Sequence, residues 1–261
     1  MVTNLTKIVF IGAGPGDPEL ITIKGKKYLE KADVVIYAGS LLNPEILKYA
    51  KPNVALYDSA TMNREEVFKV MLDSVREGKL VARVHDGDPS FFGAITEQMD
   101  FLTKEGIEYT WIPGVSCLQA GAASLKRELT MPNISQTVII TRPKGRTPVP
   151  DSESIRELAR HQTTMVIFLG VQHIESVIKE LGQGGYPKDT PVAVVYKASW
   201  QQEKTVKGTL YDIVHKVKEA GITEHALIFV GDVLSPKVHD FSKLYDPAFT
   251  HGFRKGDDNV L

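Results

Sequence analysis

Short β-branched runs alternate with longer amphipathic stretches along this chain of 261 residues, and this alternation constrains the fold more than any single motif. Runs such as KIVFI and VVIY are separated by segments with helical periodicity, and YTWI at 109–112 is the last of five strands expected in the first half. Strands that alternate with helices are typical of parallel sheets covered by helices. The sequence therefore predicts an α/β fold.

The helix expected over residues 64–77 has start and stop signals of its own. Asn63 and Glu66 have the spacing of a capping box, and Gly78 follows the last periodic residue. Further helices are expected near residues 44–48, over 91–105, and from Ser116 to about Leu125.

The alternation restarts after the polar stretch KRELTMPNISQ, with TVIIT at 137–141 as the first strand of a second series. We therefore expect two α/β domains, 1–126 and 136–240, followed by a polar surface tail at 241–261.

Composition argues against several classes of protein. The chain has 31 Lys and Arg against 32 Asp and Glu, a formal charge of -1, which gives no broad field for nucleic acid or for an anionic membrane. No apolar run approaches the roughly 18 residues of a membrane span. A single cysteine, Cys117, excludes an intrachain disulfide framework, and the N-terminus lacks a secretion signal. A cytoplasmic location is expected.

The first glycine loop, FIGAGPGDPELIT at residues 10–22, invites comparison with a dinucleotide-binding loop. Such a loop needs a third glycine and an acidic residue after the second strand. Here Asp17 occupies the third glycine position, and Ala38 follows VVIY. A phosphate ligand is therefore not expected, and Asp17 is predicted to cap a helix rather than to act as an acid. An NAD-dependent oxidoreductase is kept as an alternative.

Two further loops directly follow predicted strands: RVHDGDPSFFGA at 83–94 and IPGVSC at 112–117. The carboxyl ends of parallel strands meet at one edge of a sheet, where ligands bind in α/β folds. The three loops are therefore expected to converge on one cleft.

The three loops, in this order, resemble the tetrapyrrole methyltransferase superfamily, which includes uroporphyrinogen methyltransferases, precorrin methyltransferases and diphthine synthases. Within it, several motifs resemble the branch that methylates carbon 11 of precorrin-4 in cobalamin synthesis, and GRTPVP favours the enzymes that act on cobalt-precorrin-4. The motifs are YAGSL (37–41), GAITEQM (93–99), QTVIITR (136–142), GRTPVP (145–150) and YKASW (196–200).

This resemblance implies that S-adenosylmethionine, the methyl donor, lies in a cleft between two α/β domains, contacted mostly by backbone and small side chains. Glycine and alanine allow such close approach. The cofactor-binding residues that the resemblance implies are Asp86, Gly87, Asp88, Phe91, Ser116, Cys117, Leu169, Ala198 and Ala226.

The resemblance also places the loop containing Pro15 and Gly16 on the side of the tetrapyrrole substrate. That substrate is a polycarboxylate, so cations should bind it, and arginine suits carboxylate geometry. Arg142 and Arg146 are the expected binding residues, with Arg83, Lys144 and Lys197 as further candidates.

No catalytic base is assigned, because Ala38 stands where the uroporphyrinogen branch carries an aspartate. Structural roles are expected for His85 and Cys117, and a place in the core or the cleft wall for Trp111 and Trp200. The open alternatives are a methyltransferase for another ring position, a diphthine synthase and a non-catalytic tetrapyrrole-binding module. The resemblance also implies a homodimer and a methyl transfer for which no protein-bound metal is expected.

Overall fold

The computed structural model describes residues 7–236 and 242–257, and the chain divides into two compact units. The first unit comprises Met1–Ser124 with Lys197–Lys204, and the second comprises Leu125–Tyr196 with Thr205–Leu261. Each unit contains its own five-stranded sheet, in agreement with the predicted α/β class. The expected domain limits stay a prediction, and positions 241 and 258–261 of the expected tail lie outside the described residues.

The sheet of the first unit is entirely parallel and has the strand order β3-β2-β4-β1-β5. The central strand β4 and its neighbour β1 are buried at every position, since helices cover both faces of the sheet. The strands are β1 (Ile8–Gly12), β2 (Val34–Tyr37), β3 (Ala55–Asp58), β4 (Val81–His85) and β5 (Tyr109–Ile112).

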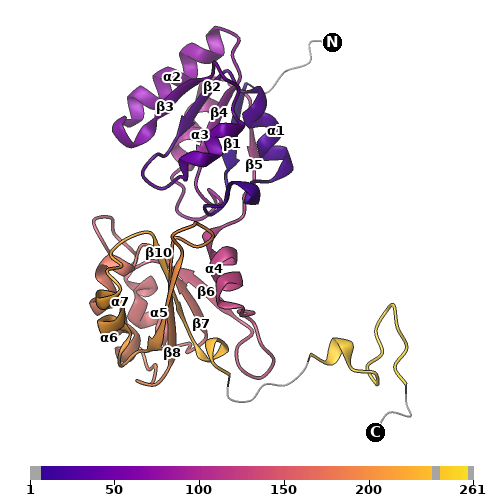
Figure 1. Ribbon diagram of the computed structural model, residues 1–261, viewed down its shortest axis with the longest axis vertical. Helices are drawn as coiled ribbons and strands as arrows, with labels where there is room; N and C mark the ends of the chain where they lie inside the picture. Colours follow the sequence, from indigo (N-terminus) through magenta and orange to yellow (C-terminus); the bar gives the residue numbers. More distant parts are fainter. Residues whose placement is uncertain (1–6, 237–241, 258–261) are drawn as a thin grey trace. The chain divides into compact units, whose positions relative to one another are not determined.

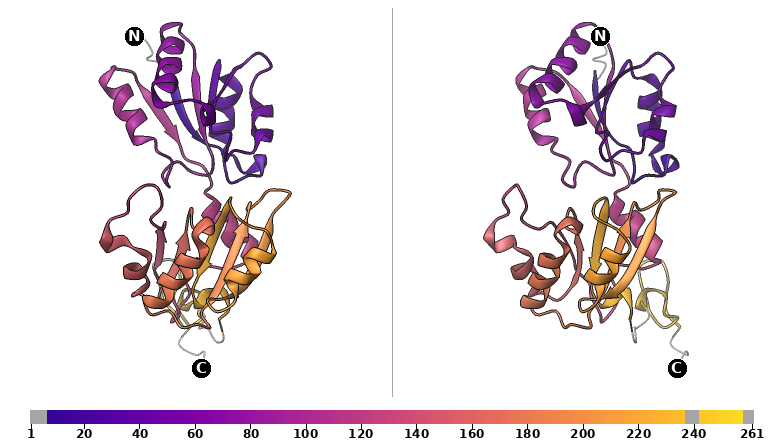
Figure 2. Two further views of the ribbon diagram at one scale, coloured as in Figure 1. Left: turned by 90° about the vertical axis from the view of Figure 1, so that its left-hand side faces the viewer. Right: turned by 60° about the vertical axis from the view of Figure 1, so that its left-hand side comes forward.

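Helices lie on both faces of this sheet, α1 on one side and α2 and α3 on the other (Figure 1, Figure 2). Leu29 of α1 packs with one apolar cluster, whereas Met71 of α2 and Leu102 of α3 pack with the opposite one. The helices are α1 (Ile23–Lys31), α2 (Arg64–Arg76), α3 (Thr96–Lys104) and α4 (Cys117–Leu125), with 3-10 helices at Pro18–Leu20, Pro44–Tyr49 and Ser59–Thr61.

The helices of the first unit agree with the sequence signals, with two exceptions. The capping box of Asn63 and Glu66 at α2 is present as predicted. The segment expected as a helix near 44–48 is a 3-10 helix. The helix expected from residue 91 begins only at Thr96, because Phe92 and Ala94 have left-handed backbone conformations (φ 57° and 48°) that an α-helix does not allow.

The sheet of the second unit is mixed and has the order β6-β7-β10-β8-β9. Strand β10 runs antiparallel to both of its neighbours, and β6 and β7 are parallel. The strands are β6 (Val138–Thr141), β7 (Thr164–Ile167), β8 (Pro191–Tyr196), β9 (Lys204–Thr209) and β10 (Ala226–Val230).

The helices of the second unit gather on one side of its sheet (Figure 1). Their apolar residues, including Val177, Leu181 and Val217, form one core with Met165 and Val194 of the strands. The helices are α5 (Ile155–Ala159), α6 (Ile174–Gln183) and α7 (Ile213–Glu219), with 3-10 helices at Asp151–Glu153, Val171–His173, Asp232–Leu234 and Lys243–Tyr245. Within the described ranges of the chain, no helix is long and apolar enough to cross a bilayer.

Candidate active site

The three loops predicted to converge do meet at the carboxyl edge of the first sheet, and they do so through glycine. A Cβ atom added to Gly114 would lie 2.2 Å from the carbonyl oxygen of Gly87 and 2.7 Å from the backbone of Gly12. Gly14 and Gly87 also exchange backbone hydrogen bonds, with N···O distances of 3.3 and 2.8 Å. Backbones this close leave no room for a side chain. One glycine from each loop is therefore required for the loops to pack together.

Asp88 joins the second loop to the third. One carboxylate oxygen accepts a hydrogen bond from the Gly114 N–H at 2.7 Å, and the other accepts from the backbone N–H of Ser90 at 2.9 Å and from its hydroxyl group. The Ser90 contact is an Asx turn. Asp88 thus fixes the shape of the site, and its bonds to protein donors occupy both oxygens.

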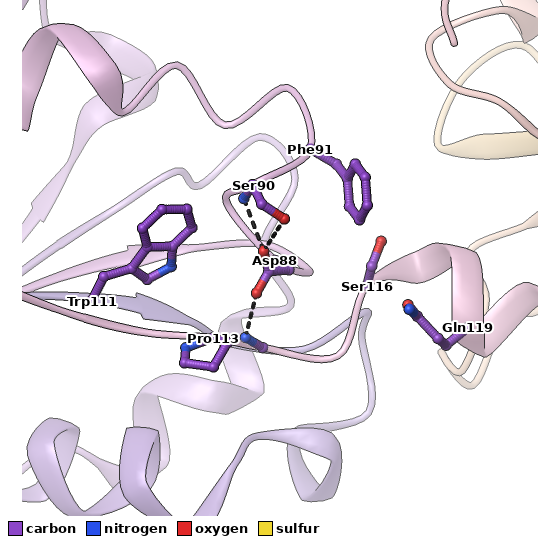
Figure 3. A pocket seen from close by; sticks show the side chains of 8 residues that line it. Asp88, Ser90, Phe91, Trp111, Pro113, Ser116 and Gln119 are labelled. Carbon is purple, nitrogen blue, oxygen red and sulfur yellow. Dashed lines mark hydrogen bonds between the residues drawn. The ribbon is translucent and has the colours of Figure 1, made fainter. Parts of the chain in front are cut away.

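A cavity of about 520 Å³ lies beside Asp88 within the first unit (Figure 3). Its wall combines two aromatic side chains with two hydroxyl groups, a carboxylate and a carboxamide. These groups come from the loops after β4 and β5, from β5 and from the start of α4. The lining residues are Asp88, Ser90, Phe91, Trp111, Pro113, Gly114, Ser116 and Gln119.

The chemistry of this cavity suits a ligand with a flat apolar part and several polar groups. Phe91 and Trp111 offer aromatic faces, while the Ser116 hydroxyl and the Gln119 amide offer donors and acceptors. Adenosine with an amino-acid tail has both kinds of group. The residues present therefore fit S-adenosylmethionine.

Cys117, at the first residue of α4, is not an activated thiol. Burial of the thiol, together with the negative charge of Asp86, raises its pKa to about 11. The Ser116 hydroxyl lies 4.0 Å from its sulfur. The group is protonated at neutral pH, so a packing role fits better than a nucleophilic one.

His85 and Arg83 lie buried under the site, on β4. Burial and the charge of Arg83 lower the pKa of His85 to about 3, and its Nε2 atom has no hydrogen-bond partner among the described residues. Burial also lowers the pKa of Arg83 to about 10; its guanidinium donates to Gln98 Oε1 at 3.0 Å and to the Ile36 carbonyl at 3.3 Å. Only 6% of Arg83 is exposed, so its position is structural and does not support a contact with substrate carboxylates.

The first glycine loop has few backbone donors left for a phosphate. The N–H groups of Ala13, Gly14 and Asp17 donate to the His85 carbonyl, the Gly87 carbonyl and the Ser199 hydroxyl. Asp17 accepts a hydrogen bond from the Glu19 N–H at 2.9 Å and caps the 3-10 helix that follows, as predicted. A pyrophosphate site needs free N–H groups, so this geometry argues against dinucleotide binding.

Ala198 lies in the first unit, in a short segment whose flanking stretches, Leu125–Tyr196 and Thr205–Leu261, belong to the second. We call the segment Lys197–Lys204 the strap; it connects β8 to β9 in sequence and belongs to the first unit. Trp200 of the strap donates from its indole N–H to the Pro15 carbonyl at 2.9 Å. The strap therefore lies against the first glycine loop, beside the two predicted substrate residues Pro15 and Gly16.

The remaining predicted residues lie in the second unit. Leu169, directly after β7, is 60% exposed and has a left-handed backbone (φ 52°), a strained state for leucine that is typical of functional positions. Ala226 begins β10 opposite Tyr196. Arg142 donates to three carbonyl groups of its own loop, including Pro148 at 2.8 Å, whereas Arg146 is exposed.

Sequence reasoning missed part of the cavity wall. Gly114 lies inside the quoted IPGVSC motif, but only the structure shows that it packs on two other loops. Trp111 was expected as core or wall, and it lines the cavity from the edge strand β5. Ser90 and Gln119 could have been inferred from the sequence, since each lies three or fewer residues from a predicted cofactor residue.

The chain matches a known protein family over most of its length. Residues 7–214 match the family of tetrapyrrole (corrin/porphyrin) methylases. The chain belongs to this family. It is 61% identical to a cobalt-precorrin-4 C(11)-methyltransferase of Methanocaldococcus jannaschii, over 97% of both chains. It is 49% identical to a protein of the same name from Priestia megaterium, over 96% of this chain and 98% of the relative. A precorrin-4 C(11)-methyltransferase of Pseudomonas aeruginosa is 43% identical over 96% and 99%.

Solved structures of tetrapyrrole methylases have the same fold. A cobalt precorrin-4 methyltransferase of cobalamin biosynthesis superposes with a TM-score of 0.86 at 47% identity, covering 88% of this chain and 97% of that one. The uroporphyrin-III C-methyltransferase of Thermus thermophilus, in complex with S-adenosylhomocysteine, gives 0.74 at 29% identity, covering 87% and 98%. These matches agree with the two-sheet α/β architecture predicted from the sequence.

Proposed function

We propose that this tetrapyrrole methylase transfers a methyl group from S-adenosylmethionine to carbon 11 of cobalt-precorrin-4, in cobalamin biosynthesis. The observation that carries the proposal is the 61% identity to a cobalt-precorrin-4 C(11)-methyltransferase over 97% of both chains. The 49% identical relative has the same name, which favours a cobalt-containing substrate over the metal-free one. The cobalt belongs to the substrate, and the described residues contain no cluster of three or more side chains suited to hold a metal ion.

The cavity beside Asp88 is the place where the first unit would hold the cofactor. When bound, S-adenosylmethionine supplies an electrophilic methyl group on a sulfonium centre. Phe91 and Trp111 would contact the flat part of the ligand, and Ser116 would bind a polar group. Asp88 keeps the loops in position, because it already bonds to Gly114 and Ser90. Asp86, Gly87 and Cys117 are neighbours of these residues in sequence, and their contact with the cofactor stays a prediction.

The protein's contribution to rate would come mainly from holding donor and acceptor in line in a site that excludes water. Positioning of this kind contributes roughly 7 to 11 kcal/mol in well-oriented reactions. It needs a rigid site, and the mutual packing of Gly12, Gly87 and Gly114 supplies one.

Substrate carboxylates need accessible cations. Arg146 is exposed on the loop after β6, so it can bind a carboxylate. The bonds of Arg142 to Pro143, Thr147 and Pro148 shape the loop that carries Arg146. Three further expectations also stay predictions. They are the homodimer, the cytoplasmic location, and the contacts of the cofactor with Leu169, Ala198 and Ala226.

The first experiment is a calorimetric titration with S-adenosylhomocysteine, with NADH as the parallel control, followed by a turnover assay on cobalt-precorrin-4. We expect one micromolar site for the former ligand, none for NADH, and a product carrying the new methyl group at carbon 11. Methylation at another carbon would support the other precorrin methyltransferases instead. Cofactor binding without turnover would support a non-catalytic module, and binding of NADH alone would contradict the proposal.

A further inference from the structure

The Phe91 turn, residues 89–94, forms one wall of the cavity beside Asp88, and its backbone folds back on itself. A Cβ atom on Gly93 would lie 2.4 Å from the Pro89 carbonyl oxygen, so the two ends of the turn are in direct contact. The Phe91 N–H donates to the Asp88 carbonyl at 3.2 Å. Phe91 therefore lies midway along a closed turn, and its side chain lines the cavity (Figure 3).

The far end of the Phe91 turn is strained and has no ordinary helix cap. Phe92 and Ala94 have left-handed backbones, and α3 begins directly afterwards with no side-chain hydrogen bond at its N-cap, Ile95. Non-glycine residues in left-handed conformations cost energy and persist only where surrounding contacts fix them. The shape of the turn therefore depends on contacts from outside it.

Gln98 of α3 supplies such a contact. Its side-chain amide nitrogen donates to the Ala94 carbonyl at 3.1 Å, and its Oε1 atom accepts from Arg83 Nε at 3.0 Å. Both Gln98 and Arg83 are buried. The bond to Arg83 fixes the direction of the amide, because a flipped amide would turn its donors toward the guanidinium and its oxygen toward the carbonyl. The amide nitrogen is thus held toward the end of the turn.

Arg83 is a buried cation whose two acceptors are uncharged. They are Gln98 Oε1 and the Ile36 carbonyl on β2, and no ion pair of Arg83 is found among the described residues. Burying a charge without an opposite charge is costly. A glutamate at position 98 would supply that charge, but a carboxylate only accepts, whereas an amide accepts from the cation and also donates to a second group. An amide at this position therefore suits the link to the turn better than it suits the cation.

We propose that Gln98 is a positioning residue for the cofactor: anchored by Arg83, it holds the Phe91 turn so that the aromatic ring faces the cavity. The proposal rests on the proposed function and extends it to a buried side chain that does not itself line the cavity. Gln98 acts through Phe91 and does not touch the ligand.

The first test is Gln98→Glu, which separates the two bonds of this side chain. The new carboxylate accepts from Arg83, which keeps it ionised, but it cannot donate to the Ala94 carbonyl. Ala94 is exposed, so water can bond its carbonyl, and we expect the urea midpoint of unfolding to stay close to that of the unmodified chain. The dissociation constant of S-adenosylhomocysteine should rise about two- to tenfold, the loss of one neutral hydrogen bond.

Two further variants separate positioning from stability. Gln98→Met removes both bonds and leaves Arg83 Nε without its acceptor, so it should unfold at a lower urea concentration than Gln98→Glu, with a similar loss of cofactor affinity. Gln183→Glu, at the exposed end of α6, makes the same change of charge and should leave the affinity within about twofold. If Gln98→Glu bound S-adenosylhomocysteine as tightly as the unmodified chain, and only Gln98→Met lost affinity, the role would be structural and the proposal overturned.

A double-mutant cycle with Phe91→Ala tests whether Gln98 acts through the ring. Phe91→Ala should itself weaken S-adenosylhomocysteine binding. In that background Gln98→Glu should change the dissociation constant by less than about twofold, because the ring that it positions is gone. Additive losses would overturn the proposal. The same cycle can be measured with Gln98→Met if Gln98→Glu does not fold.

The outcomes separate this proposal from the proposed function. A chain that lost affinity as expected in Gln98→Glu, but did not methylate cobalt-precorrin-4 at carbon 11, would contradict the proposed function and support the role of Gln98. An unmodified chain that bound no S-adenosylhomocysteine would contradict both.

Discussion

The two units hold their strand-end loops in different ways. In the first unit the loops after β1, β4 and β5 hold one another, through the contacts of Gly12, Gly87 and Gly114 and through Asp88. In the second unit the loop after β6 is held by its own Arg142, which bonds to carbonyls two of which lie five and six residues further along. A loop packed against two neighbours cannot accept an added atom, whereas a self-bonded loop can. The first arrangement suits a fixed cofactor site, and the second suits a surface that adjusts to carboxylates.

Gly114→Ala should break the first arrangement and have the largest effect. The new Cβ would lie 2.2 Å from the Gly87 carbonyl, so backbone would have to move. We expect a loss of about 3 kcal/mol or more in the free energy of unfolding, and no detectable S-adenosylhomocysteine binding. Urea denaturation followed by tryptophan fluorescence reports on the first unit, because both tryptophans lie there.

The control for this prediction is Gly182→Ala in α6, where an added Cβ meets no atom within 4 Å. Alanine in a helix should stabilise by roughly 0.5 to 1 kcal/mol, which calorimetric unfolding would detect. If Gly114→Ala were as stable as the unmodified chain, the close packing of the three loops would be contradicted.

Asp88→Asn should weaken the link between the second and third loops without adding atoms. One carboxylate oxygen becomes an NH₂ group that cannot accept from Gly114 or Ser90. We expect a loss of about 1 to 3 kcal/mol in unfolding free energy, together with weaker S-adenosylhomocysteine binding. A stable variant with unchanged cofactor affinity would show that the link is dispensable.

Acid should lower the stability of the first unit through His85. Because its pKa in the fold is about 3, below its usual 6.5, the unfolded chain binds more protons between these values, and unfolding free energy falls as the pH falls through this window. The slope approaches about 1.4 kcal/mol per pH unit for one proton. His85→Phe should flatten this dependence for the first unit, measured by urea denaturation at several pH values. An equally steep dependence in the variant would place the acid sensitivity elsewhere.

Arg146→Ala should have the smallest effect on stability and a selective effect on substrate. The side chain is exposed, so we expect a change within about 0.5 kcal/mol, with a higher KM for cobalt-precorrin-4. Arg142→Lys, which loses the bonds to Thr147 and Pro148, should disturb the loop itself. Unchanged substrate affinity in Arg146→Ala and Arg142→Ala together would contradict the role of this loop in binding carboxylates.

The strands could be predicted from the sequence because burial on both faces of a sheet requires a continuous run of apolar residues. Ile8 and Val9 point to opposite faces and both are fully buried, so the run of apolar residues is continuous. The start of α3 was predicted too early: residues 91–95 include Gly93, a poor helix former, and the backbone is left-handed at Phe92 and Ala94.

In the functional site, too, local features could be predicted and long-range contacts could not. The glycine loops were found because their motifs are short and ordered, and Asp17 was assigned as a cap because capping is a local interaction. The contact of Trp200 with Pro15 joins residues 185 positions apart, and no periodicity reports a contact of that kind. The hydrogen bonds of Arg142 to its own loop could not be predicted for another reason. A basic residue in a loop carries no sequence signal that says which carbonyl groups its side chain will bond.

The membership of the strap in the first unit also affects how the protein is made. During synthesis, the chain up to Ser124 leaves the ribosome before the strap exists, so the nascent first unit has neither the indole that bonds the Pro15 carbonyl nor the hydroxyl that pairs with the Asp17 N–H. Domains generally fold as units as they are synthesised. Here the glycine loop reaches its final form only after β8 has been translated and the strap has followed it. A fragment ending near residue 126 would therefore leave this loop unfinished, and adding the rest of the chain as a separate piece should complete it.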